Sequence, residues 1–251
     1  MGHDLQQAEA VEIDYWRTSP TESPGSESFE NILNKLTDAP VFLEGLSRYR
    51  SHLADGHVIL ELGAGQGWAS CLLTRLLGPK TRVIASDISR YALASLPLWK
   101  RLFGVSGVEG IACRSYGLPF ASGSFDAVIA FQAAHHFRAQ RRTLEEVARV
   151  LRVGGICLYL HEPACPGYMY PLARFRVNRK RPEVPEDVLV PSRLFRIARG
   201  CGLVASSDFD VSIIKRGPVE LIYYTGLRLL PWLKHLVPCT RHLVFRKAGL
   251  G

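Results

Sequence analysis

The stretch ELGAGQG, residues 61–67, places three glycines in five positions directly after the apolar run HVILEL. The run has β-branched and leucine side chains in succession, which predicts a strand buried on both faces of a parallel sheet. Glycine gives up side-chain packing but allows positive φ and the close approach of a ligand to the backbone. A core strand that ends in such a turn predicts an open α/β sheet with a ligand at its carboxyl edge.

Strand and helix patterns alternate from residue 57 onward. Helix patterns occupy residues 68–78, 90–104, 141–155 and 191–202. Strand patterns occupy residues 57–62, 81–87, 108–113, 124–131, 154–163, 203–214 and 240–247. This alternation predicts an α/β fold in one domain spanning residues 1–251, built on a doubly wound, mostly parallel sheet.

The segments around this alternation have distinct compositions. Residues 1–53 predict an N-terminal helical cap of short helices at 9–16 and 29–53, joined by a flexible Ser-, Pro- and Gly-rich loop at 18–28. Residues 57–162 form the predicted ligand-binding core. Residues 163–190 hold five prolines and little periodicity, which predicts an insertion after the fifth strand on the acceptor side of the site. Residues 191–251 complete the fold.

The charge and cysteine content limit the partner and the compartment. The net charge is +8, and residues 171–251 carry 15 Lys and Arg against 6 Asp and Glu. This excess favours either an anionic partner or a solvated basic face. Six cysteines without CxxC spacing predict reduced thiols and a cytoplasmic location. The polar N-terminus and the lack of a long apolar run predict neither a secretory signal nor a membrane-spanning helix.

A carboxylate follows the glycine turn at the end of the next predicted strand. Asp87 ends the next predicted strand, twenty residues after Gly67. Adjacent parallel strands end at the same edge, and a carboxylate there can accept hydrogen bonds from both hydroxyls of a ribose. The pair predicts an adenosine-containing cofactor. The alternative is an aspartate that caps a helix beside a packing turn.

Four segments in order carry a family resemblance: ILELGAGQG, ASDIS, LPFASGSFDAVIAFQAAHHF and RVLRVGG. Over about residues 57–162 the chain resembles the class I, seven-stranded S-adenosylmethionine-dependent methyltransferases, in particular their type 11 small-molecule group. The resemblance implies a Rossmann-like fold with S-adenosyl-L-methionine as cofactor. The implied reaction is methyl transfer to an oxygen, nitrogen or carbon atom of a small molecule. An anionic or lipid-linked acceptor is one possibility.

The resemblance also assigns cofactor contacts by position. Asp87 would hold the ribose and Ile88 the adenine face, while Glu61 would contact the loop or the amino group through water. Arg114 stands where the family often has an acidic residue, so the adenine edge is assigned to Ser115 with Tyr116 as a platform. The remaining implied cofactor contacts are Gly63, Ala64, Gly65, Gly67, Gln132 and Tyr15. In the resembled family an aromatic ring of an N-terminal helix can cover the sulfonium of the cofactor, which is the role implied for Tyr15 and Trp16. The alternative is that these two residues only anchor the cap to the core.

The chemistry needs a base only if the acceptor must lose a proton. Candidate side chains follow the strands at 124–131 and 154–163: Gln132, His135, His136, His161 and Glu162. His136 or His135 is the expected base because histidine titrates near neutral pH, with backbone packing as the alternative. No metal site is predicted, because nothing fixes a ligand geometry.

The basic cluster at 174–181 opens several interpretations. Its cationic side chains are Arg174, Arg176, Arg179, Lys180 and Arg181. They would hold a phosphate or carboxylate of the acceptor. Together with the apolar segment 220–238 they would otherwise rest on an anionic membrane, and a lid packed on the domain is the third interpretation. RNA is disfavoured, because the sequence contains no recognised RNA-binding module.

Two other functions remain open. A nicotinamide-dependent oxidoreductase would keep the fold, but the ExGxGxG spacing and the LPF…FD block speak against it. A non-catalytic S-adenosylmethionine-binding partner of another enzyme is the second alternative. The sequence makes no prediction of oligomeric state.

Overall fold

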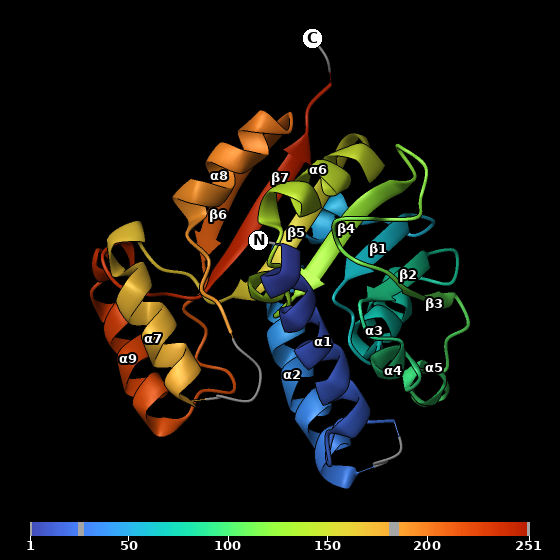
Figure 1. The fold of residues 1–251 in the computed structure, drawn as a ribbon, viewed down its shortest axis with the longest axis horizontal. Coiled ribbons are helices and arrows are strands. Elements are labelled where there is room, and N and C mark those ends of the chain that lie inside the picture. The colour runs from blue at the N-terminus through green and yellow to red at the C-terminus, as the bar shows by residue number, and fades with distance from the viewer. Residues whose placement is uncertain (1, 25–27, 181–185, 250–251) are drawn as a thin grey trace.

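The computed structural model describes residues 2–24, 28–180 and 186–249 (Figure 1). Its centre is a seven-stranded sheet with the order β3-β2-β1-β4-β5-β7-β6. The strands are β1 Val58–Leu62, β2 Arg82–Asp87, β3 Val108–Ala112, β4 Phe125–Phe131, β5 Leu151–Glu162, β6 Leu203–Phe209 and β7 Arg241–Lys247. The first five are parallel, and β7 is antiparallel to both β5 and β6. The predicted doubly wound, mostly parallel sheet is confirmed.

Helices cover both faces of the sheet (Figure 1). The helices are α1 Gly2–Thr18, α2 Phe29–Ser47, α3 Trp68–Leu77, α4 Arg90–Leu93, α5 Leu96–Phe103, α6 Gln140–Val150, α7 Tyr170–Lys180, α8 Pro191–Gly200 and α9 Pro218–Leu229. Short 3₁₀ turns lie at residues 50–52, 134–136, 167–169 and 233–235. Helices α2, α3 and α5 contribute to the core on one face, and α6 and α8 to the core on the other.

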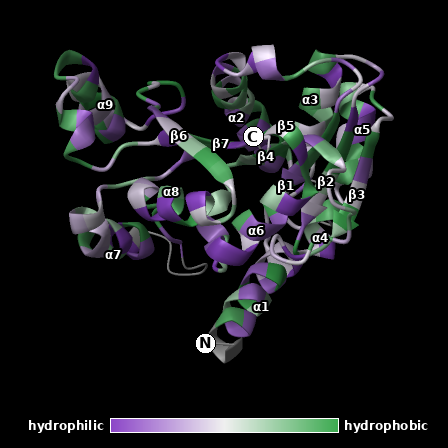
Figure 2. Cartoon of the chain, turned by 90° about the horizontal axis from the view of Figure 1, so that it is seen from above, coloured by the Kyte–Doolittle hydropathy of each residue, from purple (hydrophilic) through white to green (hydrophobic). Residues whose placement is uncertain are grey.

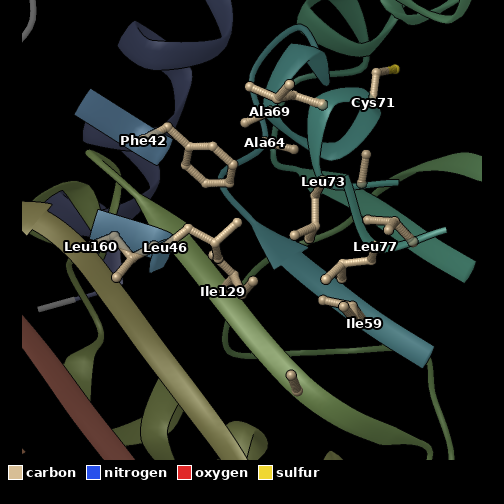
Figure 3. Close-up of a cluster of buried hydrophobic side chains, with 14 of the residues drawn as sticks. Phe42, Leu46, Ile59, Ala64, Ala69, Cys71, Leu73, Leu77, Ile129 and Leu160 are labelled. Carbon is tan, nitrogen blue, oxygen red and sulfur yellow. The ribbon is translucent and has the colours of Figure 1, made fainter. Parts of the chain in front are cut away.

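Alternating side chains of the central strands fill these two cores. Ile59 of β1 belongs to one core and Leu60 to the other. Figure 3 shows Phe42 and Leu46 of α2 directed at the face that carries Ile59, Ile129 of β4 and Leu160 of β5. Because β1 is buried on both faces, its sequence is a continuous apolar run rather than an alternating one. The strand is therefore rigid at the point where the glycine turn leaves it.

Several predicted boundaries differ from the structure. The helix expected at 141–155 ends at Val150, because Leu151 already pairs with Phe125 of β4 and begins β5. The helix expected at 90–104 is two helices, because Pro97 occupies the first turn of α5, where proline is tolerated, rather than a helix interior. The strand expected at 203–214 ends at Phe209, since the Asp210 carboxylate accepts the Ser212 N–H and turns the chain. The cap helix expected at 9–16 spans residues 2–18. The insertion at 163–190 contains α7 where little order was expected.

Some predicted features lie outside the described residues. These are residues 25–27 of the expected entry loop and residues 181–185 of the insertion, including Arg181 of the basic cluster. Within the described part of the chain, no helix is long and apolar enough to cross a membrane. Helices α7 and α9 lie at the same end of the molecule, away from strands β1–β3 (Figure 1), and Figure 2 shows them separate from one another.

Candidate functional site

A cavity of about 830 Å³ opens at the carboxyl ends of β1, β2, β4 and β5. Its floor is made by residues at these strand ends, and α1 and α2 supply another wall. The floor residues are Leu62, Gly63, Ser86, Asp87, Ile88, Gln132 and His161. The volume is in the upper range of small-molecule sites, which run to roughly 1,000 Å³. The carboxyl edge of an open α/β sheet is also where ligands bind in such folds.

Two positions of the glycine turn require glycine, because a Cβ atom there would clash with neighbouring side chains. Gly63 has φ +67°, and a Cβ on it would lie 2.6 Å from the Cβ of Ala133. Gly67 has φ +78° and stands directly before α3, where a Cβ would lie 2.6 Å from Leu96. The turn between them is held by the Ala64 N–H, which donates to the Ser86 carbonyl at 2.9 Å. Gly63 lines the cavity, and the absence of its side chain lets Ala133 pack against the turn.

Asp87 lies at the centre of the cavity floor. Its carboxylate accepts the Gly65 N–H and the Ser89 N–H, each at 2.8 Å. Burial raises the pKa of Asp87 to about 6, against the opposing effect of these hydrogen bonds. Each carboxylate oxygen keeps lone-pair capacity beyond one N–H. The side chain therefore ties the glycine turn to the end of β2 and remains able to accept further donors from a ligand.

Glu61 and Gly65 lie beside the cavity rather than on its lining. The Glu61 carboxylate accepts a hydrogen bond from the Ser70 hydroxyl of α3, and burial raises its pKa to about 7. Trp16 packs over Gly65: a Cβ added there would lie 3.2 Å from the indole ring. Glu61 thus joins β1 to the first turns of α3.

Helix α1 forms a wall of the cavity that the sequence analysis left unassigned beyond Tyr15 and Trp16. Its cavity-lining residues are Leu5, Ala8, Glu9, Glu12, Tyr15 and Trp16. They follow the i, i+3, i+4, i+7 spacing of one helix face, and this spacing is the signal that would have identified them. Helix α1 therefore presents two carboxylates and two aromatic rings to the cavity.

The two carboxylates of α1 have different surroundings. Glu9 accepts from the Arg114 guanidinium at 2.9 Å and from the Tyr116 hydroxyl. For Glu12 no hydrogen bond is found within the described residues. Burial raises the pKa of Glu12 to about 7, and the neighbouring Asp87 adds to the rise. Glu12 is thus a partly desolvated acid that faces the same space as Asp87.

The segment predicted to read the adenine edge does line the cavity. Arg114, Ser115 and Tyr116 all contribute to the wall, together with Cys113. The Ser115 and Thr143 hydroxyls lie 2.9 Å apart, and the Tyr116 ring stacks beneath Arg142 with 4.4 Å to the ring centroid. Arg114, where the resembled family often carries an acid, is paired here with Glu9 of α1. The acidic group on this side of the cavity comes from the cap.

His135 is buried and lies outside the cavity lining. Its Nδ1 lies 2.7 Å from Glu162, and the same carboxylate accepts the N–H groups of Ala133, Ala134 and His135. Burial opposes the charged ring, but the hydrogen bond to Glu162 and the negative charge of that and neighbouring carboxylates together raise the pKa of His135. The two residues fasten the turn after β4 to the end of β5.

His136 does line the cavity, and its ring lies against that of His135 with 4.2 Å between centroids. The structure thus separates the two expected bases: one faces the cavity and the other supports it from behind.

A second histidine–carboxylate pair does reach the cavity. His161 lines it, and its Nδ1 lies 2.6 Å from Oδ2 of Asp210. Burial alone would raise the pKa of Asp210. The hydrogen bond and the charge of His161, together with His242 and the Ser212 N–H, hold that pKa well below its usual range. The His161 N–H donates to Nδ1 of His242 at 3.1 Å, and burial lowers the pKa of His242 to about 4, so that this ring is a neutral acceptor.

Backbone strain marks the same two strand ends. Gln132 after β4 has φ +50° and His161 near the end of β5 has φ +56°. Positive φ is uncommon for residues other than glycine, and such strain gathers at functional sites. Both residues line the cavity, beside one another across the β4–β5 pair. The sequence analysis named both residues but missed Asp210, which follows the end of β6, a strand that runs in the same direction as β5 but is separated from it by the antiparallel β7.

The basic cluster lies elsewhere. Arg174, Arg176 and Arg179 are exposed on α7, and none of them lines the cavity. The charges that do line its outer wall are Glu22, Lys35, Asp38, Arg138, Glu186, Lys215 and Glu220. Lys215 bridges to Asp38 of α2 at 2.7 Å. The expectation that the cluster holds the acceptor inside the site therefore finds no support in the geometry.

No metal centre is found among residues 2–24, 28–180 and 186–249: the structure gathers no group of three or more potential metal-ligating side chains there.

Comparison with known proteins identifies the core of the chain. Residues 60–159 match the family described as "Methyltransferase domain". Phthiotriol/phenolphthiotriol dimycocerosates methyltransferase 1 of Mycobacterium ulcerans is 36% identical over 104 residues, which are 41% of this chain and 37% of that protein. A ubiquinone/menaquinone biosynthesis C-methyltransferase of Desulfotalea psychrophila is 31% identical over 118 residues, 47% of this chain and 46% of that protein. The chain spans less than half the length of these relatives.

The fold match extends over nearly the whole chain. Geranyl diphosphate C-methyltransferase from Streptomyces coelicolor A3(2), solved with Mg²⁺, geranyl diphosphate and S-adenosyl-L-homocysteine, superposes with a TM-score of 0.70 at 13% identity. The match covers 96% of this chain and 98% of that one. Sequence family, strand order and the antiparallel β7 agree, and the chain therefore carries the domain of the class I S-adenosylmethionine-dependent methyltransferases.

Proposed function

We propose that the protein transfers the methyl group of S-adenosyl-L-methionine to a small, largely apolar acceptor. The observation that carries this proposal is the single cavity that joins two groups of residues. Gly63 and Asp87 lie at its β1–β2 side, where the fold binds a nucleoside, and His136 and His161 lie at its β4–β5 side. A cofactor held by the first group would direct its reactive end toward the second.

The residues of the first group fit this cofactor. Asp87 would accept the ribose hydroxyls, Gly63 would let the amino-acid part approach the backbone, and Ile88 would cover an adenine face. Carboxylates outnumber cations among the lining residues, seven to four. This lining suits a ligand with a sulfonium and an α-amino group. It also favours a neutral acceptor over the anionic one that the sequence analysis allowed.

The bound cofactor would supply an activated methyl group, so the protein's main task is alignment of the acceptor. We propose His161 as the general base for an acceptor that must lose a proton. Its Nδ1 is held by Asp210, which orients the ring and leaves Nε2 as the proton acceptor. His136, which also lines the cavity, is the second candidate, and His135 supports the turn between them.

The similar proteins support an acceptor of lipid character. Two relatives are named for phthiotriol dimycocerosates and for ubiquinone/menaquinone biosynthesis. We propose that the acceptor of this protein is lipid-like as well. A cytoplasmic location is proposed as well, because all six cysteines are free.

Calorimetric titration with S-adenosyl-L-homocysteine tests the cofactor assignment. We expect wild-type protein to bind it, and Asp87→Asn to lose about tenfold or more of the affinity while keeping its fold, since one carboxylate acceptor becomes an amide. Asp14→Asn, on the exposed side of α1, is the matched control and should bind like wild type. A folded wild type that binds no S-adenosyl-L-homocysteine would overturn the proposed function.

A methyl-transfer assay with labelled cofactor then tests the acceptor class. Prenylated phenols and long-chain alcohols should accept the label, whereas phosphorylated or carboxylated analogues of the same size should accept less. The reverse order would contradict a neutral acceptor while leaving the cofactor assignment intact.

A further inference from the structure

Helix α9 leaves an apolar stripe without a partner in the chain. Val219, Ile222 and Leu229 are 73%, 75% and 75% exposed, and their spacing places them on one face of the helix. The opposite face carries Tyr224 and Leu227, which are buried with Cys239 in a small cluster of their own. The helix is thus anchored on one side and apolar toward solvent on the other. Figure 2 shows it at the end of the molecule that lies away from β1–β3.

The exposed apolar surface continues beyond the helix. Leu230, Trp232 and Leu236 follow in the chain and are 48%, 59% and 49% exposed. Helix α7 in the same lobe and the turn before it add the exposed side chains of Tyr168, Leu172 and Phe175. The Tyr168 hydroxyl donates to the Leu236 carbonyl, which joins the two segments. We call residues 167–180 and 218–237 together the α7–α9 lobe. Exposed apolar side chains in this number on one lobe indicate a contact site.

Basic side chains surround this surface. Arg174, Arg176 and Arg179 are exposed on α7, and Arg228 is exposed on α9. Arg176 lies close enough to α9 to oppose the rise that burial gives to the pKa of Tyr223. The last third of the chain, residues 171–251, holds the whole positive excess of the protein, 15 Lys and Arg against 6 Asp and Glu. The occupant of the apolar stripe should therefore combine an apolar interior with negative charge.

We propose that the α7–α9 lobe docks on the surface of an anionic lipid bilayer. A helix with an apolar stripe and flanking basic residues lies in the interface plane, with its stripe among the acyl chains and its cations at the head groups. Exposed Trp232 is a side chain typical of that interface. The contact needs no spanning helix, and none is found in the described part of the chain.

The position of α9 connects this surface to the cavity. Glu220, in its first turn, lines the cavity, and the next-door Val219 begins the apolar stripe. A docked lobe would hold the cavity mouth near the bilayer, so that an apolar acceptor could enter without crossing water. This last step rests on the proposed function, whereas the docking itself does not.

Vesicle co-sedimentation tests the docking. We expect wild-type protein to bind phosphatidylcholine vesicles that contain about 30% phosphatidylglycerol, and to bind pure phosphatidylcholine vesicles and high-salt samples more weakly. The double variant Ile222→Glu/Leu229→Glu should lower the partition coefficient by about tenfold or more, because two charges replace the stripe. Leu102→Glu, at a leucine of α5 that is 56% exposed and lies outside the lobe, should bind like wild type. Arg176→Gln/Arg228→Gln should weaken binding only to the anionic vesicles, and Arg75→Gln is its control.

Two results would overturn the docking. One is a folded wild type that does not bind anionic vesicles, or binds them as well after the stripe is charged. The other is a dimer in lipid-free solution that the stripe variant dissociates, which would assign the stripe to a second copy. Binding of S-adenosyl-L-homocysteine, measured on the same samples, tests the proposed function separately. If wild-type protein binds vesicles but not S-adenosyl-L-homocysteine, the docking stands and the proposed function fails.

Discussion

The Nδ1 atom of His161 lies 2.6 Å from Oδ2 of Asp210, although 49 residues separate them in the chain. Asp210 follows β6, at the far edge of the sheet, and reaches His161 across the end of β7. The backbone of His161 is held by His242 of β7, at a positive φ. The C-terminal antiparallel strands therefore position a side chain of the cavity, and are more than a cover for the parallel core.

Replacement of His161 by glycine should abolish proton abstraction without disturbing the strained backbone, because glycine adopts φ +56° freely. We expect kcat of methyl transfer to fall about 10²–10⁴-fold for an acceptor that loses a proton, with unchanged affinity for S-adenosyl-L-homocysteine. Added imidazole should restore part of the rate. Stopped assays with labelled cofactor measure both. A larger loss in His136→Asn than in His161→Gly would assign the base to His136 instead.

Asp210 should act through His161 as a positioning residue. Asp210→Asn keeps an oxygen for the Ser212 N–H but removes the charge beside the ring. We expect kcat to fall and the acceptor KM to stay within about twofold, since acceptor contacts are unchanged. An acceptor that needs no deprotonation should be methylated at the wild-type rate by this variant. Equal losses for both acceptor types would indicate a structural role only.

Gly63→Ala should damage cofactor binding beyond its effect on stability. The new Cβ would lie 2.6 Å from Ala133 in a turn with φ +67°, so the turn must move where it faces the cavity. Gly104→Ala is the matched control: its φ is +62°, but nothing lies within 4 Å of the new Cβ. Both should lose about 1 kcal/mol or more to backbone strain. Only Gly63→Ala should weaken the affinity for S-adenosyl-L-homocysteine measured by calorimetry. Equal affinities of the two variants would contradict the proposal that the cofactor approaches the backbone at Gly63.

The sheet was predictable because its signals are local. The apolar runs at 57–62 and 124–131 and the glycine turn each report burial or backbone freedom within a few residues. The break at Pro97 and the turn at Asp210 were missed, since each depends on one residue overriding a favourable pattern around it. Helix α7 was missed for the opposite reason: prolines surround a segment whose interior is helical.

The site was predictable where its residues stand at the carboxyl ends of strands of the parallel core, as do Gly63, Asp87, Gln132 and His161. Asp87 and Gly63 follow consecutive strands, so chain order alone brings them to one edge. His161 and Asp210 also lie at the carboxyl ends of strands with the same direction, but the later strand β7 is inserted between β5 and β6, so chain order does not indicate that the two side chains meet. Glu9 and Glu12 come from the cap, whose docking over the cavity depends on side-chain contacts that form only in the folded chain.

Gln66 should be the residue that fastens the cap to the glycine turn. Its buried side chain accepts from Asn31 Nδ2 and Trp99 Nε1, each at 3.1 Å, and donates to the Glu22 carbonyl at 2.9 Å. Gln66→Ala would leave two donors without this acceptor, at a cost of about 2–4 kcal/mol in unfolding free energy. Hydrogen exchange of α1 and α2 should accelerate more than that of α6. Uniform acceleration across the chain would instead indicate global destabilisation without a specific role in the cap.

Glu12 should make the ligand-free protein less stable as pH rises. Its pKa is about 7 in the folded chain, chiefly because burial penalises the carboxylate, against 4.5 as its ordinary value. Between these values the folded state holds the proton more tightly than the unfolded state, so stability is lost as pH rises through this window. Above it, the cost should reach about 2–3 kcal/mol.

Glu12→Gln removes that cost without removing the side chain's volume. We expect the variant to be more stable than wild type by about 2 kcal/mol in urea at neutral to alkaline pH, and equal to it near the lower end of the window. Buried acids that do not interact with Glu12 cancel in the difference, whereas the repulsion between Glu12 and Asp87 is part of the effect that the variant removes. Asp14→Asn, on the exposed side of the same helix, should show no pH-dependent difference from wild type. A Glu12→Gln effect that is the same at both pH values would refute a titrating carboxylate in the cavity, because a change of packing alone does not follow protonation.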